Sequence, residues 1–111
     1  MAEARAVDVR VVEVPERARF EIRVGGEVAG FTEYRLRPGA IAFLHTETNP
    51  RLEGRGLGSA LVRAALAEAR GRRLAVLPFC PFVRGYIAKH TEYLDLVPTD
   101  MRAKFDLPAH G

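Results

Sequence analysis

The fold is decided by residues 41–70, which read IAFLHTETNPRLEGRGLGSALVRAALAEAR. The continuous apolar start at 41–44 is typical of a central strand that is covered on both faces. Asn49-Pro50 ends this strand, and a glycine-rich turn leads into a segment whose apolar residues recur at helical spacing. These residues are Leu57, Leu61, Val62, Ala65, Leu66 and Ala69. The segment therefore predicts a strand, a glycine-rich turn and a helix.

A glycine-rich turn before a helix can bind a phosphate group through the backbone. The N–H groups converge on the anion, and the helix N-terminus adds about half a positive charge. Arg51 and Arg55 would add charge-assisted contacts. The alternative is that the glycines only permit a tight turn and close packing of the helix on the sheet. Two known phosphate loops fit poorly, because no Gly-Lys-Ser/Thr follows and the spacing is Gly-x-Gly-x-Gly.

Further strands are predicted before this segment, and a strand and a second helix are predicted after it. Period-two patterns predict strands at 7–12, 20–24 and 28–36, and Gly25-Gly26 is a hairpin signal. A short strand at 74–77 and a second helix at 82–90 follow the first helix. The expected fold is α+β: a mostly antiparallel, mixed five-stranded sheet with two main helices and a β-α-β crossover, whose two strands are parallel. We expect residues 1–97 to form one domain and residues 98–111 a C-terminal tail.

Length and composition limit the classes of function. The chain has 111 residues, of which 48% are hydrophobic and 28% charged, so we expect one domain and, if it is an enzyme, a minimal one. Cys80 is the single cysteine, which excludes an intrachain disulfide. No signal peptide or membrane-spanning stretch is evident, and we expect a cytoplasmic protein. The net charge of +3 comes from scattered residues without a basic stripe, which argues against a nucleic-acid partner.

The turn and the segments after it resemble a known family. Residues 54–61 look like the acetyl-CoA pyrophosphate loop of GNAT N-acetyltransferases, whose motif is Gln/Arg-x-x-Gly-x-Gly/Ala. Further residues narrow the resemblance to small single-domain GNAT proteins of the YjdJ type: His45-Thr46, Pro78-Phe79-Cys80-Pro81-Phe82-Val83, Tyr86, His90 and Glu92-Tyr93. The match covers roughly 41–97. It implies a minimal GNAT fold that keeps the part holding coenzyme A.

The motif departs from the family at its first position. In the usual register this position falls on Glu53, whereas a shifted register begins at Arg51. The first register is preferred because it places Gly58-Ser59 at the start of the helix. A carboxylate near a pyrophosphate would be repulsive, so we expect the Glu53 side chain to point to solvent and Arg51 to supply the charge.

The resemblance also implies a binding site for acetyl-CoA between the strands at 41–48 and 74–77. The backbone of the first strand would pair with the pantetheine arm, and the turn would bind the pyrophosphate. The implied binding residues are His45, Thr46, Glu47, Thr48, Arg51, Gly54, Arg55, Gly56, Leu57, Gly58, Ser59, Ala60, Cys80, Tyr86, Lys89 and His90. No residues have the spacing of a zinc site, so no metal is expected.

The function implied is transfer of an acetyl group from acetyl-CoA to a primary amine. Candidate catalytic residues are Cys80, His45 and Glu47. His45 or Glu47 would deprotonate the amine; Cys80 would protonate the departing thiolate, carry the acetyl group, or only line the site. The alternative is a non-catalytic module that binds coenzyme A or acyl-CoA. The acceptor is open, and we expect a monomer or a weak homodimer.

Overall fold

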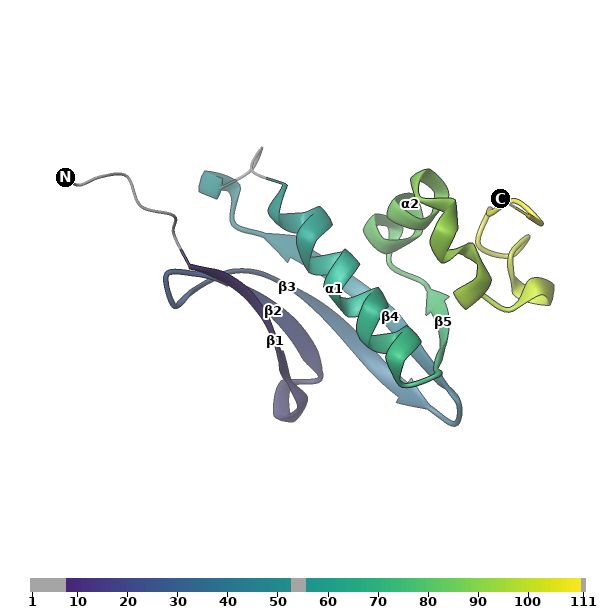
Figure 1. Cartoon of the computed structure of the whole chain (residues 1–111), viewed down its shortest axis with the longest axis horizontal. Coiled ribbons are helices and arrows are strands. Elements are labelled where there is room, and N and C mark those ends of the chain that lie inside the picture. Colours follow the sequence, from purple (N-terminus) through teal and green to yellow (C-terminus); the bar gives the residue numbers. More distant parts are fainter. Residues whose placement is uncertain (1–7, 53–55, 111) are drawn as a thin grey trace.

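The structure is a computed structural model that describes residues 8–52 and 56–110. Five strands form one sheet in the order β1-β2-β3-β4-β5, with two α-helices after β4 and β5 (Figure 1). The bounds are β1 Val9–Val14, β2 Arg19–Val24, β3 Glu27–Arg37, β4 Ala40–Thr48, α1 Leu57–Gly71, β5 Ala75–Pro78 and α2 Pro81–Lys89. Strands β1 to β4 are antiparallel, and β5 is parallel to β4. The expected α+β class and mixed five-stranded sheet are therefore confirmed.

Local sequence explains where the strands turn. Gly25 and Gly26 have φ values of 60° and 88°, so they adopt the left-handed conformation that a two-residue hairpin between β2 and β3 needs. Strand β5 begins at Ala75 and ends at Pro78, and Pro81 then occupies the first turn of α2. Proline is tolerated there because the first N–H groups of a helix have no intrahelical partner.

The pairing between β3 and β4 shifts by one residue part of the way along β4. Glu33 pairs with His45 and Tyr34 pairs with Phe43, which leaves Leu44 as an extra residue in β4. On its other side β4 pairs with β5 only from Ala40 to Phe43. Beyond Phe43 the two strands separate, and no strand of the described residues pairs with that side of β4.

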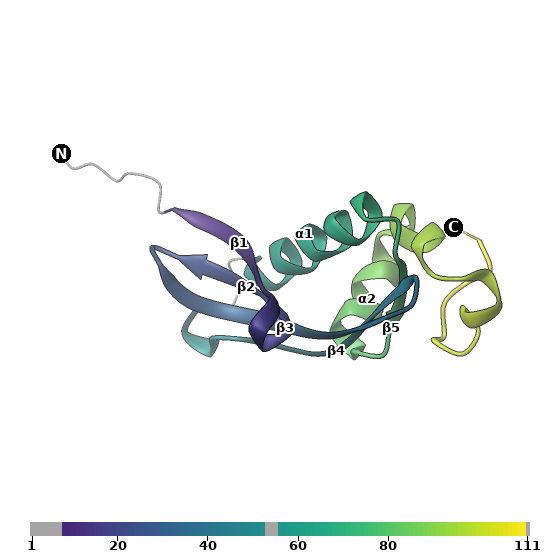
Figure 2. The ribbon, with the colours of Figure 1, turned by 90° about the horizontal axis from the view of Figure 1, so that it is seen from below.

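The sheet has two unlike faces. Both helices pack on the face that carries Phe20, Ile22 and Phe43, and Figure 2 shows α1 lying across this face with α2 on the same side. The opposite face, which we call the open face, carries side chains that lie outside the core cluster. They include Arg19, Glu21, Arg23, Val28, Phe31, Glu33, Arg35, His45 and Glu47. The division follows from the period-two alternation of strands.

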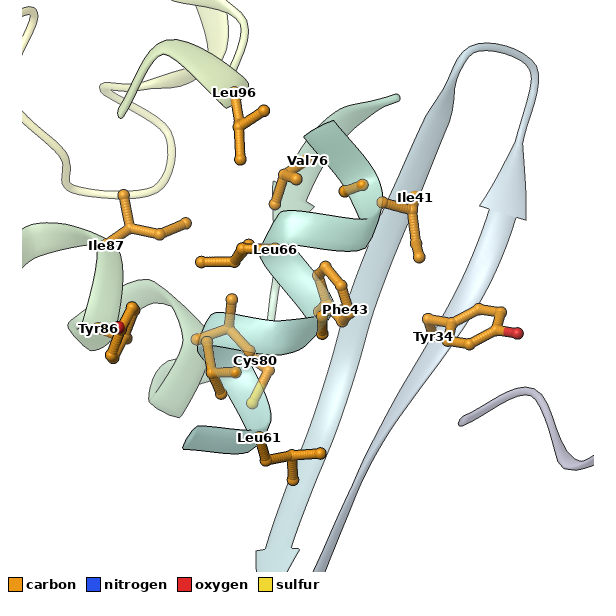
Figure 3. Packing of buried hydrophobic residues seen from close by; sticks show 14 of the residues in the cluster. Tyr34, Ile41, Phe43, Leu61, Leu66, Val76, Cys80, Tyr86, Ile87 and Leu96 are labelled. Carbon is orange, nitrogen blue, oxygen red and sulfur yellow. The ribbon is translucent and has the colours of Figure 1, made fainter. Parts of the chain in front are cut away.

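The core lies between the sheet and the two helices. Its fully buried side chains include Phe43, Leu61, Leu66 and Ile87 (Figure 3). The segment after residue 97, expected as a tail, adds Phe105 and Leu107 to this cluster, with 2% and 6% of their surface exposed. No helix in the described ranges is both long and apolar enough to cross a membrane.

Candidate functional site

The N-terminus of α1 presents free backbone donors. Gly56 precedes the helix with φ 70°, a conformation that favours glycine, and its carbonyl accepts the N–H of Ala60 at 3.0 Å. No side chain of the described residues caps this end by a hydrogen bond. The first N–H groups of a helix have no intrahelical acceptor, so this end of α1 offers donors and a positive dipole to an anion.

A groove runs from this end of α1 along α2. It has a volume of about 230 Å³ and is lined by Ser59, Pro81, Phe82, Gly85, Tyr86, Lys89 and His90. The rings of Tyr86 and His90 stack at 4.1 Å between centroids. Burial, with a smaller contribution from Tyr93, raises the pKa of the Tyr86 hydroxyl, which therefore keeps its proton at neutral pH. Lys89 is exposed and supplies a positive charge at the rim.

Gly58 shapes the same groove from the side of α1. A Cβ atom on Gly58 would lie 2.7 Å from the Cζ atom of Phe82. The absence of a side chain at this position lets the Phe82 ring of α2 lie directly against the first turn of α1. The sequence singled out Gly58 for backbone contact with a phosphate, and the structure gives it this second role in packing.

Cys80 lies at the point where β4 and β5 separate. It is the residue before α2, its N–H donates to the carbonyl of Phe43 at 2.9 Å, and it is 2% exposed. Its sulfur is 3.1 Å from Oγ1 of Thr46, and that oxygen is 2.9 Å from Oγ1 of Thr32, which is fully buried. The two hydroxyls and the thiol form one hydrogen-bonded chain from β3 through β4 to the start of α2.

His45 and Glu47 lie on the open face. Nε2 of His45 is 2.8 Å from Oε2 of Glu47, and both side chains are more than half exposed. A histidine held through one ring nitrogen by a carboxylate keeps its other nitrogen available as a base. The structure thus brings His45 and Glu47 together, but it places Cys80 with Thr46 on the helix side of the sheet.

The comparisons with known proteins agree with this geometry. Residues 19–96 match the model of a family described as GCN5-related N-acetyl-transferase. The chain belongs to this GNAT family. That match covers all of β2 to α2, including the separation of β4 from β5 and the start of α1.

One solved structure supports the same fold. The chain is similar to a ribosomal-protein-alanine N-acetyltransferase from Brucella melitensis biovar Abortus 2308, with a TM-score of 0.53 and 16% identity. The similarity covers 85% of this chain and 92% of that one. At this identity the likeness concerns the fold alone. No curated protein matches the chain.

The GNAT fold explains which sequence-predicted positions come together. Gly56, Leu57, Gly58, Ser59 and Ala60 form the start of α1. Ser59 also lines the groove with Tyr86, Lys89 and His90. Thr48 ends β4, and Arg51 is exposed in the short turn Pro50–Leu52. Gly54, Arg55 and the side-chain direction of Glu53 lie outside the described residues.

The sequence did not predict that Thr32 contributes to this site, or that the hydroxyl of Thr46 does. Thr32 was not singled out, because its contact with Thr46 depends on the register between β3 and β4. Thr46 was expected to contribute backbone, whereas its hydroxyl is the group that contacts Cys80. The sequence does show that Thr46 faces the other side of the sheet from His45 and Glu47, because these residues flank it in a strand.

Proposed function

We propose that this GNAT protein is an acetyl-CoA-dependent N-acetyltransferase that acts on a primary amine. The observation that carries the proposal is the N-terminus of α1, which no described side chain caps, together with the side of β4 beyond Phe43, which no described strand pairs with. Coenzyme A has a pyrophosphate and an amide-bearing pantetheine arm. An uncapped helix end suits the first, and an unpaired strand edge suits the second.

Each part of the chain has a task in this proposal. The backbone of residues 56–60 donates hydrogen bonds to the pyrophosphate, and residues 44–48 pair with the pantetheine arm. The groove along α2 takes the nucleotide end, where Lys89 meets a phosphate group. The thioester then lies near residue 44, at the point where β4 and β5 separate.

The chemical step needs a base and an acid. His45, held by Glu47, takes a proton from the ammonium form of the acceptor on the open face. The neutral nitrogen attacks the thioester carbonyl, the C–S bond breaks, and the Cys80 thiol gives its proton to the departing thiolate. The nitrogen then loses its second proton as the amide forms, and that proton restores the Cys80 thiol through solvent. Binding both reactants across one strand supplies the orientation that accounts for much of the rate.

Covalent transfer through Cys80 is a distinct route with a distinct signature. In that route the acetyl group moves first to the sulfur, and the amine attacks the acyl-enzyme. Mass spectrometry after incubation with acetyl-CoA alone detects an acetyl adduct on Cys80 only in this case. Full turnover by Cys80→Ala would rule out both roles of the thiol.

The test of the proposal is calorimetric titration with acetyl-CoA, followed by a turnover assay that detects released coenzyme A thiol. The expected result is saturable binding with release of thiol in the presence of an amine. Lack of binding at millimolar acetyl-CoA would contradict the proposal. Binding without turnover against a broad panel of amines would favour a module that only binds coenzyme A.

A further inference from the structure

We infer that the open face binds the acceptor beside Phe31 and Glu47, and that this acceptor is a small aliphatic amine bearing one ammonium group. The inference rests on the proposed function and adds the chemical class of its second substrate. The argument depends on a groove, on the charge within it and on the charges around it.

The groove lies at the end of β4, where Val28, Phe31 and Glu47 present their side chains on the open face. It has a volume of about 220 Å³ and is lined by Val28, Ala29, Gly30, Phe31, Glu47, Thr48, Asn49 and Pro50. Val28 is 40% exposed and Phe31 is half-buried, so apolar surface is available to a ligand. Neither of these side chains belongs to the core cluster, so neither is needed to fill the protein interior.

Glu47 is the one charged side chain among the described residues that line this groove. Its carboxylate is more than half exposed and already contacts Nε2 of His45. A carboxylate has more than one acceptor position, so Glu47 can bind an ammonium group while it holds His45. The ammonium nitrogen is then next to the imidazole that has to take its proton.

Phe31 provides a surface for an aliphatic chain. Its ring lies 4.3 Å from the guanidinium carbon of Arg19 and 6.3 Å, edge on, from the ring of His45. The Phe31 ring therefore lines the groove and also lies next to the ring of His45. An alkyl chain of a few carbons lying on Phe31 and Val28 would place its amino end at Glu47 and His45.

Size and charge restrict the acceptor further. A volume of about 220 Å³ is below the roughly 300 Å³ at which pockets for drug-sized ligands begin. Arg23 of the neighbouring strand β2 faces the same side of the sheet, where it pairs with Glu21 at 2.8 Å, and Arg35 lies further along β3. The described lining of the groove holds one carboxylate, Glu47, so the groove can neutralise one ammonium group but not several.

The experiment uses the full chain and n-pentylammonium as the probe. Backbone amide NMR signals are followed during titration with n-pentylammonium, with 1-pentanol as a neutral probe of similar shape. The expected result is saturable shifts at residues 28–31 and 47–49 with the ammonium compound at millimolar concentration. Three results would overturn the inference. They are equal shifts with 1-pentanol, shifts confined to the groove along α2, and no shifts at 50 mM n-pentylammonium, a concentration about tenfold above that at which half-saturation is expected.

Two variants test the role of charge. Glu47→Gln should raise the half-saturating concentration of n-pentylammonium at least threefold. Glu16→Gln, which removes an exposed carboxylate from the turn between β1 and β2, should leave it unchanged. Equal effects of the two substitutions would mean that only net charge matters, and would contradict the inference. If a lysine-rich peptide binds more tightly than n-pentylammonium, the acceptor is polybasic and the inferred small amine is wrong.

A third variant and a parallel titration separate this inference from the proposed function. Phe31→Ala should raise the KM for pentylamine and leave the KM for acetyl-CoA unchanged. Acetyl-CoA is titrated in the same NMR experiment, with shifts expected at 44–48 and 56–60. If acetyl-CoA binds there while n-pentylammonium does not bind the open face, the acceptor inference fails and the proposed function stands. If acetyl-CoA does not bind, the proposed function itself fails.

Discussion

The hydroxyl oxygen of Thr46 lies 3.1 Å from the sulfur of Cys80 and joins the middle of β4 to the residue that begins α2. The same oxygen contacts the buried hydroxyl of Thr32 at 2.9 Å. Because Cys80 also donates its N–H to Phe43, it is held both by backbone and by side chain. The thiol therefore has a fixed position where the two parallel strands separate.

Replacing Thr46 by valine tests what this contact does. Valine keeps the branched shape but removes the partner of both Cys80 and Thr32, and a buried hydroxyl without a partner costs about 1–3 kcal/mol. We expect Thr46→Val to lower the free energy of unfolding by about 1–2 kcal/mol. If the thiol protonates the leaving group, turnover should also fall about tenfold, equal to about 1.4 kcal/mol in the barrier.

The matched control is Thr46→Ser, which keeps the hydroxyl. We expect it to restore turnover to near the level of the unchanged protein even where its stability stays lower. Urea denaturation and steady-state release of thiol measure the two effects separately. Wild-type behaviour of Thr46→Val in both assays would show that the hydrogen-bonded chain has neither role.

The comparison of sequence and structure at β4 shows what a sequence can reveal. The strand and the helix are local patterns, and both form where the periodicity predicts them. The alternation of His45, Thr46 and Glu47 between two faces is also local. Which face Cys80 shares is not local, because it depends on the crossover that brings β5 beside β4. The grouping of Cys80 with His45 and Glu47 was therefore beyond what spacing could test.

Gly58→Ala is expected to weaken acetyl-CoA binding several-fold. The added Cβ would lie 2.7 Å from the Phe82 ring, which is 44% exposed and must turn into the groove to make room. Helix stability itself should not fall, because alanine is favoured over glycine within a helix by about 1 kcal/mol. Calorimetric titration with acetyl-CoA measures the change in Kd.

Two further variants identify the cause of such weakening. Gly71→Ala, at the other end of α1, meets no atom within 4 Å and should leave the Kd unchanged. Adding Phe82→Ala to Gly58→Ala removes the clash and should restore much of the lost affinity. If the double variant binds as weakly as Gly58→Ala, the loss comes from the backbone at residue 58 and not from the ring.

Glu13→Gln should lower the free energy of unfolding and should make that free energy depend less on pH. Glu13 accepts hydrogen bonds from Arg72, the residue after α1, and from the hydroxyl of Tyr34. The bond to Arg72 is the main reason that the pKa of Glu13 lies below its usual value of 4.5, although burial opposes it. Burial, together with the same carboxylate, raises the pKa of Tyr34 to about 12, so that hydroxyl remains a donor at neutral pH.

The sign of the pH effect follows from the lowered pKa. The stabilisation is complete above pH 4.5 and is lost as the pH falls through the lower pKa of the folded state. Because Arg72 is 37% exposed, we expect only about 1 kcal/mol at pH 7, and a smaller difference between Glu13→Gln and the unchanged protein in acid. Glu68→Gln, which removes an exposed partner of the same arginine, should cost about 0.3–0.5 kcal/mol. Urea denaturation at several pH values would contradict this account if the two substitutions cost the same.

Phe105→Ala should destabilise the protein by about 3 kcal/mol, as expected for truncation of a buried aromatic side chain. Phe105 is 2% exposed and meets the ring of Phe79 edge on, with 5.0 Å between centroids, so the segment after residue 97 packs against the residue that follows β5. Leu36→Ala, at a position that is 54% exposed, is the control and should cost less than about 1 kcal/mol. Urea denaturation measures both losses in the free energy of unfolding. If Phe105→Ala costs no more than Leu36→Ala, the segment after residue 97 does not contribute to the stability of the domain.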